Sequence, residues 1–333
     1  HALERGIVPI AYLNPYLPLP VFRRRDAART RLGEMVSQIV QKRRDSGETH
    51  EDFLQTLMES KYKDGRGLSD HEITGMLVAA MFAGHHTSSV TTAWCILEML
   101  RHPEWMAHIR SELSDVFPNG QSIDYASLKR LTKLEWVIKE VLRLHPPLFI
   151  LIRVALEDTE VLGHAIKKGT WVALSPSVAH QLEDVFPDAS SFCPHRFGPP
   201  RTEDKTPFSY IAFGGGRHKC LGNSFAILQI KTILAILLQR FEFGLTDDPI
   251  EPDFQALVIG PKAPARVTYK RIRSHQERAA SRTTVSLRQA TVDSSSDTPQ
   301  AIRVAVDFDL CQGHGACEVE APGVFEVGED GVL

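Results

Sequence analysis

The sequence has few cysteines, little net charge and no long uninterrupted apolar run. Its five cysteines are scattered through 333 residues. This pattern excludes the disulfide framework of a small secreted protein and favours core thiols or metal ligands in a reducing, cytoplasmic compartment. A formal net charge of −3 gives no general attraction to nucleic acid or to an anionic membrane, so no nucleic-acid partner is expected. The longest apolar stretches are amphipathic or broken by polar residues, and no transmembrane span is predicted.

Neither end of the sequence has the features of a natural terminus. It begins at His1 without a signal peptide and stops at Gly331-Val332-Leu333. Both ends are therefore expected to be truncations, and membrane association of a preceding N-terminal part is left open.

Hydrophobic periodicity predicts a mainly α fold with a small β region. The long central helix begins at a capping box, Ser69 to Glu72, and its nearly continuous apolar surface predicts that it crosses the core. Residues 186–210 are expected to form a long ordered meander. The other expected helices cover 23–45, 51–60, a segment starting at Pro103, 132–144 and 222–239. The expected strands lie near 151–157, 159–166 and 170–175, with a terminal hairpin within 254–272.

Composition divides the chain into two modules. Residues 273–300 are rich in Ser, Thr, Arg, Gln and Ala, which is typical of a flexible linker. Alternation resumes at Ala301, where AIRVAVDFDL predicts a strand. The expected modules are therefore 1–272 and 301–333.

The motif with the clearest chemistry is FGGGRHKCLG, from Phe213 to Gly222. A cysteine that binds a metal must be a thiolate, and a following helix N-terminus helps to hold that charge. The glycines before Cys220 allow positive φ angles and close approach of the backbone to a flat cofactor. A glycine-rich turn with a buried cysteine is the alternative, whereas a phosphate loop is disfavoured because no Lys-Ser/Thr pair follows the glycines.

Two further patterns lie on predicted helices. Glu140 and Arg143 are three residues apart, so both side chains lie on one helix face and can form an ion pair. A solvent-exposed pair is the ordinary alternative. Ala83, Gly84 and Thr87 place small residues and a hydroxyl within the long helix, where a close helix crossing is the alternative.

Together these motifs resemble the cytochrome P450 family, whose ligand motif is Phe-x-x-Gly-x-(Arg/His)-x-Cys-x-Gly. The matching residues are Phe213, Gly216, His218, Cys220 and Gly222. The resemblance implies a partial P450 fold over residues 1–272. It also implies that Cys220 is the axial thiolate ligand of haem b iron, with dioxygen as co-substrate. Glu140, Arg143 and Arg196 of FCPHRF are then expected to form a buried structural network.

Within the family, several stretches resemble sterol 14α-demethylase. They are MFAGHHTSS at 81–89, LRLHPPLFILIR at 142–153, and His218 where most of the family has Arg. The resemblance implies that Arg153 and His218 bind the haem propionates and that His86 and Thr87 form a proton-relay pair. For His86, a structural helix histidine is the alternative. The residues matched to the sterol cavity are Phe82, Ala83, Leu148, Ile150 and Val258.

The activity that this resemblance implies is removal of a sterol 14α-methyl group by three successive oxygenations. The alternatives left open are a P450 hydroxylase of another apolar substrate, a non-catalytic haem or electron-transfer protein, and an inactive fragment. Because both ends are expected to be truncated, stable haem binding by the chain alone is not expected.

The second module carries the segment DLCQGHGACEVEAPGVF at 309–325. Thiolates in a glycine-containing loop suit an iron–sulfur cluster, with zinc or two unrelated thiols as alternatives. The segment resembles the start of a bacterial three-iron ferredoxin, which implies Cys311 and Cys317 as cluster ligands and a last ligand beyond Leu333. The fused α+β ferredoxin module is then expected to supply electrons in cis, with a ferredoxin reductase and NAD(P)H as external partners.

Overall fold

The computed structural model describes residues 14, 17–118, 122–201 and 203–272. The chain divides into two units, His1–Arg273 and Ser274–Leu333, and every described residue belongs to the first unit. The linker predicted at 273–300 and the ferredoxin module predicted at 301–333, with Cys311 and Cys317, lie outside the described residues.

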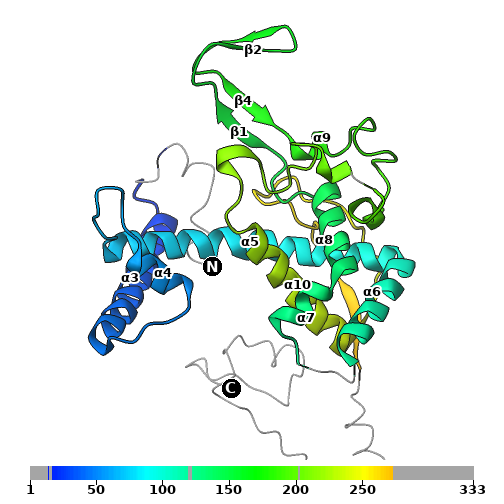
Figure 1. Cartoon of the computed structure of the whole chain (residues 1–333), viewed down its shortest axis with the longest axis horizontal. Coiled ribbons are helices and arrows are strands. Elements are labelled where there is room, and N and C mark those ends of the chain that lie inside the picture. Colours follow the sequence, from blue (N-terminus) through cyan, green and yellow to red (C-terminus); the bar gives the residue numbers. More distant parts are fainter. Residues whose placement is uncertain (1–13, 15–16, 119–121, 202, 273–333) are drawn as a thin grey trace, which may run out of the picture. The chain divides into compact units, whose positions relative to one another are not determined.

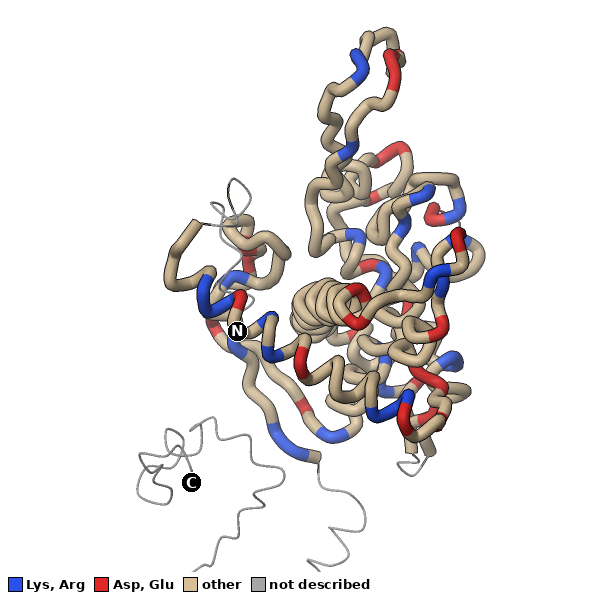
Figure 2. The backbone as a smooth tube through the Cα atoms, turned by 90° about the vertical axis from the view of Figure 1, so that its left-hand side faces the viewer, with Lys and Arg blue, Asp and Glu red and all other residues tan. Residues whose placement is uncertain are grey.

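The central element of this unit is helix α5, Asp70–Arg101 (Figure 1). The predicted capping box is present, because the Ser69 hydroxyl accepts from the Glu72 amide and the Glu72 carboxylate accepts from the Ser69 amide. The charged residues of α5 lie only near its two ends, and Figure 2 shows the helix end-on among the surrounding segments. Its second half is buried, but Met76 and Met81 in the first half are 42% and 67% exposed. Helix α5 therefore crosses the main core through its second half, whereas no described segment packs closely enough to bury these two side chains of the first half.

Apart from the short α9, the remaining described helices form two groups, each of which shares a core with part of α5. The first group is α3, Pro20–Ser46, and α4, Phe53–Glu59, which share a small core with Ile73 of α5. The second group forms the main core with the buried half of α5. Its helices are α6, Pro103–Val116; α7, Tyr125–Arg130; α8, Thr132–Leu144; and α10, Asn223–Arg240.

Three antiparallel strand pairs form the β region, and each pair is a separate two-stranded sheet. The pairs are β1, Leu151–Val154, with β4, Trp171–Leu174; β2, Thr159–Val161, with β3, His164–Ile166; and β5, Phe241–Leu245, with β6, Val267–Arg271. The segment expected as one strand at 159–166 is instead a hairpin that turns at Leu162 and Gly163, both of which have positive φ.

The terminal hairpin expected within 254–272 is wrong. Strand β6 pairs with β5, from Phe241 opposite Arg271 to Leu245 opposite Val267. The Phe241 and Tyr269 rings meet across this ladder with centroids 5.7 Å apart. Aromatic contact between two strands far apart in sequence therefore outweighs the local pairing that the 254–272 segment suggested.

The meander connects α9, Pro176–Ala179, to the loop that precedes α10, through the 3-10 turns η2, Pro194–Phe197, and η3, Glu203–Lys205. The expected fold class, mainly α with a small β region, is confirmed. None of the described helices is long and apolar enough to cross a membrane.

Candidate functional site

The cysteine motif forms a tight loop immediately before helix α10. The Cys220 amide donates to the carbonyl of Phe213 at 2.9 Å, which closes the loop. Gly214 and Gly216 have φ angles of 68° and 64°, and residues other than glycine rarely adopt these positive values. The short 3-10 helix η4, Gly216–His218, forms the turn between them and Cys220.

The Cys220 side chain is exposed at the N-terminus of α10, where Gly222 is the N-cap residue. A Cβ atom at Gly222 would lie 3.8 Å from the Cys220 sulfur, so the sulfur sits beside the first turn of the helix. A helix N-terminus stabilises nearby negative charge, and a thiolate ligand carries one. The loop therefore presents an accessible sulfur in surroundings that suit haem-iron ligation.

The other predicted haem contacts are Arg153, on a strand that borders this loop, and His218, within the loop. Leu151 of β1 is 4.0 Å from the Cβ position of Gly214, so β1 borders the cysteine loop. Arg153 is two residues further along β1, and its Nη1 donates to the carbonyl of Ile152 at 2.8 Å. His218 ends η4, two residues before Cys220, and is exposed.

The predicted relay residues share one stretch of α5. The Thr87 hydroxyl donates to the carbonyl of Ala83 at 2.7 Å. The His86 ring lies edge-on to Phe82, with centroids 5.9 Å apart, and to His85, with centroids 4.9 Å apart. Residues four apart lie on the same face of a helix. Phe82 is therefore next to His86, and Ala83 is next to Thr87, on two adjacent faces of α5.

The structure joins the two segments that carry the other predicted cavity residues. The Ile259 amide donates to the carbonyl of Pro147 at 2.9 Å, which places Val258 next to the segment with Leu148 and Ile150. The Leu148 and Ile150 side chains are 44% and 40% exposed.

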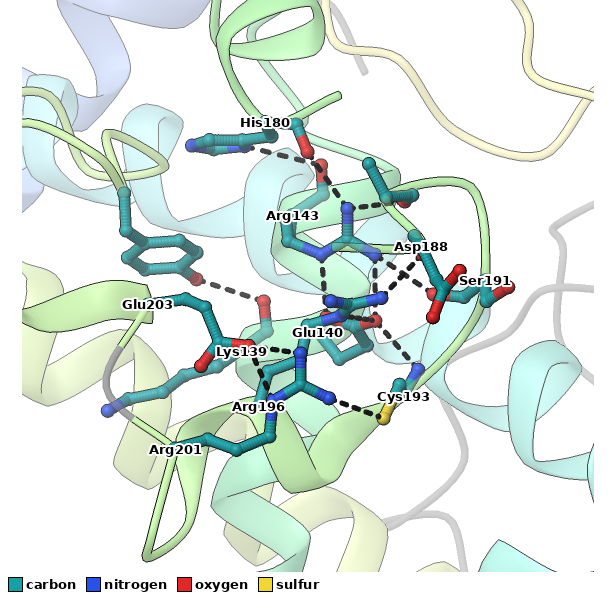
Figure 3. A network of polar contacts seen from close by, with 12 residues as sticks. Lys139, Glu140, Arg143, His180, Asp188, Ser191, Cys193, Arg196, Arg201 and Glu203 are labelled. Atoms are coloured by element: carbon teal, nitrogen blue, oxygen red, sulfur yellow. Dashed lines mark hydrogen bonds and ion pairs between the residues drawn. The ribbon is translucent and has the colours of Figure 1, made fainter. Parts of the chain in front are cut away.

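Helix α8 supplies a buried polar network, shown in Figure 3. Arg143 is fully buried, and each of its five N–H groups has an acceptor. Two of the five bonds go to the Glu140 carboxylate, at 2.7 and 2.8 Å. The other three go to the carbonyls of His180, Ala189 and Ser191, at 2.9, 2.6 and 3.0 Å.

The third predicted member of this network, Arg196, also contacts Glu140. Its Nε donates to Glu140 Oε1 at 3.3 Å, and its Nη atoms donate to the carbonyls of Pro187 and Asp188 (Figure 3). The Cys193 amide donates to the same Glu140 oxygen at 2.7 Å. The network therefore fastens the meander to α8.

Sequence reasoning missed His180, which belongs to this network. It is fully buried, with Nδ1 3.2 Å from the Arg143 carbonyl. The Ile211 amide donates to its Nε2 at 2.9 Å. Burial lowers the pKa of His180 from 6.5 to about 4. A single histidine in SVAHQL carries no motif, because its role depends on residues that only the folded chain brings together.

Tyr210, which is also part of this region, stacks on His180 with ring centroids 5.2 Å apart. Its hydroxyl donates to the carbonyl of Lys139 at 3.1 Å. Burial raises the pKa of Tyr210 well above 10, so the phenol remains a neutral donor.

Comparison with known proteins gives one consistent result. A family model described as Cytochrome P450 matches residues 6–268. The obtusifoliol 14-alpha demethylase of Sorghum bicolor is 47% identical over 279 residues, 81% of this chain and 57% of that protein. The sterol 14alpha-demethylase of Mycolicibacterium vanbaalenii is 41% identical over 278 residues, 81% of this chain and 62% of that protein.

Among solved structures, retinoic acid bound cyanobacterial CYP120A1 matches with a TM-score of 0.70 and 29% identity, over 77% of this chain and 59% of that chain. The chain thus spans 57% to 62% of the length of these relatives. Since the family model covers most of the sequence and both the helical fold and the cysteine loop agree with it, the chain belongs to the cytochrome P450 family.

Proposed function

We propose that this protein is a haem-thiolate monooxygenase and that its reaction is oxidative removal of a sterol 14α-methyl group. The observation that carries the proposal is the Cys220 loop, with an exposed sulfur at the N-terminus of α10 in a chain of the cytochrome P450 family. The relatives named as obtusifoliol and sterol 14-demethylases support the choice of substrate.

Several residues around the loop are suited to hold haem b. The thiolate of Cys220 is the iron ligand, while His218 and Arg153 supply a donor and a cation for the propionates. The positive φ of Gly216 lets the loop turn before the ligand, and a side chain there would strain the backbone. When bound, the haem supplies the activation of dioxygen for oxygen insertion.

Thr87 and His86 are proposed to hold and move the two protons that each oxygenation consumes. The Thr87 hydroxyl already donates its hydrogen to the Ala83 carbonyl. A hydroxyl also has two acceptor lone pairs, so Thr87 Oγ can receive a hydrogen bond while its rotation stays fixed. His86, on the preceding position of the same helix, is then the proton source.

The substrate is proposed to lie against apolar side chains on three segments. These side chains are Phe82, Ala83, Leu148, Ile150 and Val258. Three oxygenations at one carbon proceed most efficiently when the same molecule stays bound between steps, which an apolar cavity favours for a sterol and its oxidised intermediates.

Electrons are proposed to come from the fused ferredoxin module at 301–333, with Cys311 and Cys317 as ligands of an iron–sulfur cluster. An external ferredoxin reductase that oxidises NAD(P)H would reduce it, and a cytoplasmic location is part of the proposal. A tethered donor stays at a high effective concentration near its acceptor.

The proposal is tested by the carbon monoxide difference spectrum of the haem-loaded protein, expressed with the further length that its relatives have. Cys220→Ala is expected to abolish the red-shifted thiolate band, because no other sulfur occupies the loop. Cys193→Ala is the matched control, since Cys193 contacts Glu140 through its amide and its sulfur accepts from Arg201 at 3.6 Å, outside the cysteine loop, and it is expected to keep the band. A band that survives in Cys220→Ala would refute the ligand assignment.

Substrate class is tested separately by titration of the wild-type protein. A 14α-methyl sterol is expected to give a spectral shift of the bound haem, and no shift would reject the sterol while leaving the thiolate assignment intact. Retinoic acid is a useful second ligand, because one solved relative with this fold carries it. A shift with retinoic acid alone would favour a P450 hydroxylase of another apolar substrate.

A further inference from the structure

We propose that Glu98 is a positioning residue that holds both substrate-facing segments, 145–150 and 250–260, in register with helix α5. The inference rests on the proposed function, because the importance of these segments comes from their predicted contact with substrate. The observation behind it is a closed circuit of polar contacts that begins and ends at the Glu98 carboxylate.

Glu98 is a buried carboxylate near the end of α5, with 4% of its surface exposed. Its Oε1 lies 2.9 Å from Nε2 of His145 and 3.1 Å from Nη1 of Arg101, and its Oε2 lies 3.5 Å from Nδ1 of His102. Burial alone would raise the pKa of Glu98, but the His145 hydrogen bond and the nearby positive charges lower it overall. The other titratable group beside it is the buried thiol of Cys95.

His145 connects this carboxylate to the first segment. The carboxylate can only accept, so Nε2 of His145 carries the hydrogen of this bond. The imidazole also lies flat on the Trp94 ring of α5, with centroids 3.8 Å apart and planes 1° apart. His145 ends α8 and precedes Pro146 and Pro147, whose rings fix φ. Anchoring the His145 ring therefore also fixes the direction in which the chain continues to Leu148 and Ile150.

Arg101 connects the same carboxylate to the second segment. While its Nη1 contacts Glu98, its Nη2 donates to the carbonyl of Ile250 at 3.0 Å. The Ile259 amide then donates to the Pro147 carbonyl and closes the circuit. Gly260 also lies against α5, since a Cβ atom there would come within 2.7 Å of Val90.

The consequence for the proposed reaction is geometric. Glu98 is eleven residues from Thr87 on one continuous helix, roughly 17 Å along its axis. Helix α5 therefore connects the proposed proton relay at Thr87 with Glu98, whose contacts hold both substrate-facing segments. Loss of the Glu98 bridge would let these segments shift relative to Thr87 without touching the cysteine loop.

The test compares Glu98→Gln with Glu112→Gln in the haem-loaded protein. Glu112 is the matched control because it is also a buried helical carboxylate with several partners, but none of them belongs to this circuit. We expect Glu98→Gln to keep the thiolate band, to weaken sterol binding about tenfold and to release more partly oxidised sterol. Glu112→Gln is expected to lower the unfolding midpoint and to leave the sterol affinity within about twofold of wild type.

Backbone hydrogen exchange gives a readout that does not depend on activity. Amides in 145–150 and 250–260 are expected to exchange faster in Glu98→Gln than in Glu112→Gln. His145→Asn should reproduce the effect, and the double variant should add little to either single change, because both remove one interaction.

Two outcomes would overturn the inference: equal loss of sterol affinity in Glu98→Gln and Glu112→Gln, or unchanged exchange of both segments in Glu98→Gln. If instead the wild-type protein failed to bind sterol at all, the proposed substrate would be wrong, while the exchange experiment would still decide whether the Glu98 circuit holds the two segments.

Discussion

At the scale of single residues, His180 links the buried arginine network to the cysteine loop. Its Nδ1 faces the carbonyl of Arg143, and its Nε2 accepts from the amide of Ile211. The carbonyl of Ile211 in turn accepts from the amide of Gly214 at 2.8 Å, at the start of the loop. Since a carbonyl can only accept and an amide donates, His180 is neutral with its hydrogen on Nδ1. A second proton on Nε2 would break the bond to Ile211.

Protonation of His180 is therefore expected to make stability depend on pH. The pKa is about 4 in the folded protein and near 6.5 in the unfolded chain. Between these values the unfolded chain binds more protons, so stability is complete above pH 6.5 and falls as the pH drops towards 4. The loss should reach about 3 kcal/mol, measured by denaturant unfolding across this pH range.

The matching variants separate His180 from the other histidines. His180→Gln should be less stable at pH 7.5 but should lose the part of the pH dependence that His180 causes. The exposed His164 is the control, and His164→Gln should retain the wild-type pH dependence. An unaltered pH dependence in His180→Gln would show that the imidazole is not held neutral by this burial.

Residues of the site differ in how far their roles could be predicted from the sequence. The turn of the Cys220 loop could be predicted because its glycines and the start of the following helix lie within ten residues, so that local backbone geometry determines the conformation. Glu140 and Arg143 could be placed on one helix face, but their contact with Arg196 followed only from the family resemblance. His180 and Glu98 could not be found, since their partners come from elements distant in sequence and only burial gives them a role.

At the scale of whole elements, helix α8 depends on a cap supplied by another helix. Its N-cap residue is Leu131, which has no side chain able to accept a hydrogen bond. The Glu112 carboxylate of α6 takes that place, because it accepts from the amides of Lys133 and Leu134 at 2.7 and 2.9 Å. The negative charge also lies at the positive end of the α8 dipole.

Glu112→Gln is therefore expected to destabilise the protein. Glutamine has one neutral oxygen where glutamate has two charged ones. In Glu112→Gln, one of the two backbone amides of the first turn therefore loses its hydrogen-bond acceptor, and the other keeps a weaker one. The expected loss is about 1 to 2 kcal/mol in the free energy of unfolding, measured by denaturant titration. Glu59→Gln, an exposed change on α4, should stay close to wild type, and an equal loss in both variants would contradict the capping role.

The predicted elements succeeded where the sequence pattern was local. The bounds expected for α8 agree with the structure, since its apolar spacing and the two following prolines define both ends. Helix α7 was missed because its six residues are too short to show a period. Strand β6 was recognised as extended but was assigned the wrong partner, because strand pairing across more than twenty residues leaves no periodic signal.

At the scale of the whole molecule, the division at Arg273 separates two units. The family model ends at residue 268, and strand β6 completes its pairing with β5 at Arg271. The amide of Ile272 then donates to the carbonyl of Arg240 at 2.7 Å, which ties the end of this unit to the end of α10. The core, the cysteine loop and the buried network are therefore all encoded before Arg273.

Deletion of residues 274–333 is accordingly expected to leave the thermal unfolding midpoint of the first unit unchanged. Because the last proposed cluster ligand lies beyond Leu333, the electron-transfer test uses a protein that carries the whole ferredoxin module. Removal of that module from residue 274 onward is expected to abolish reduction of the haem-loaded protein by reductase and NAD(P)H alone. Reduction should return when a separate ferredoxin is added at about millimolar concentration, comparable to the effective concentration that a short tether provides. A lower midpoint would show that the units are not energetically independent. Undiminished reduction would show that residues 274–333 do not carry the electron donor.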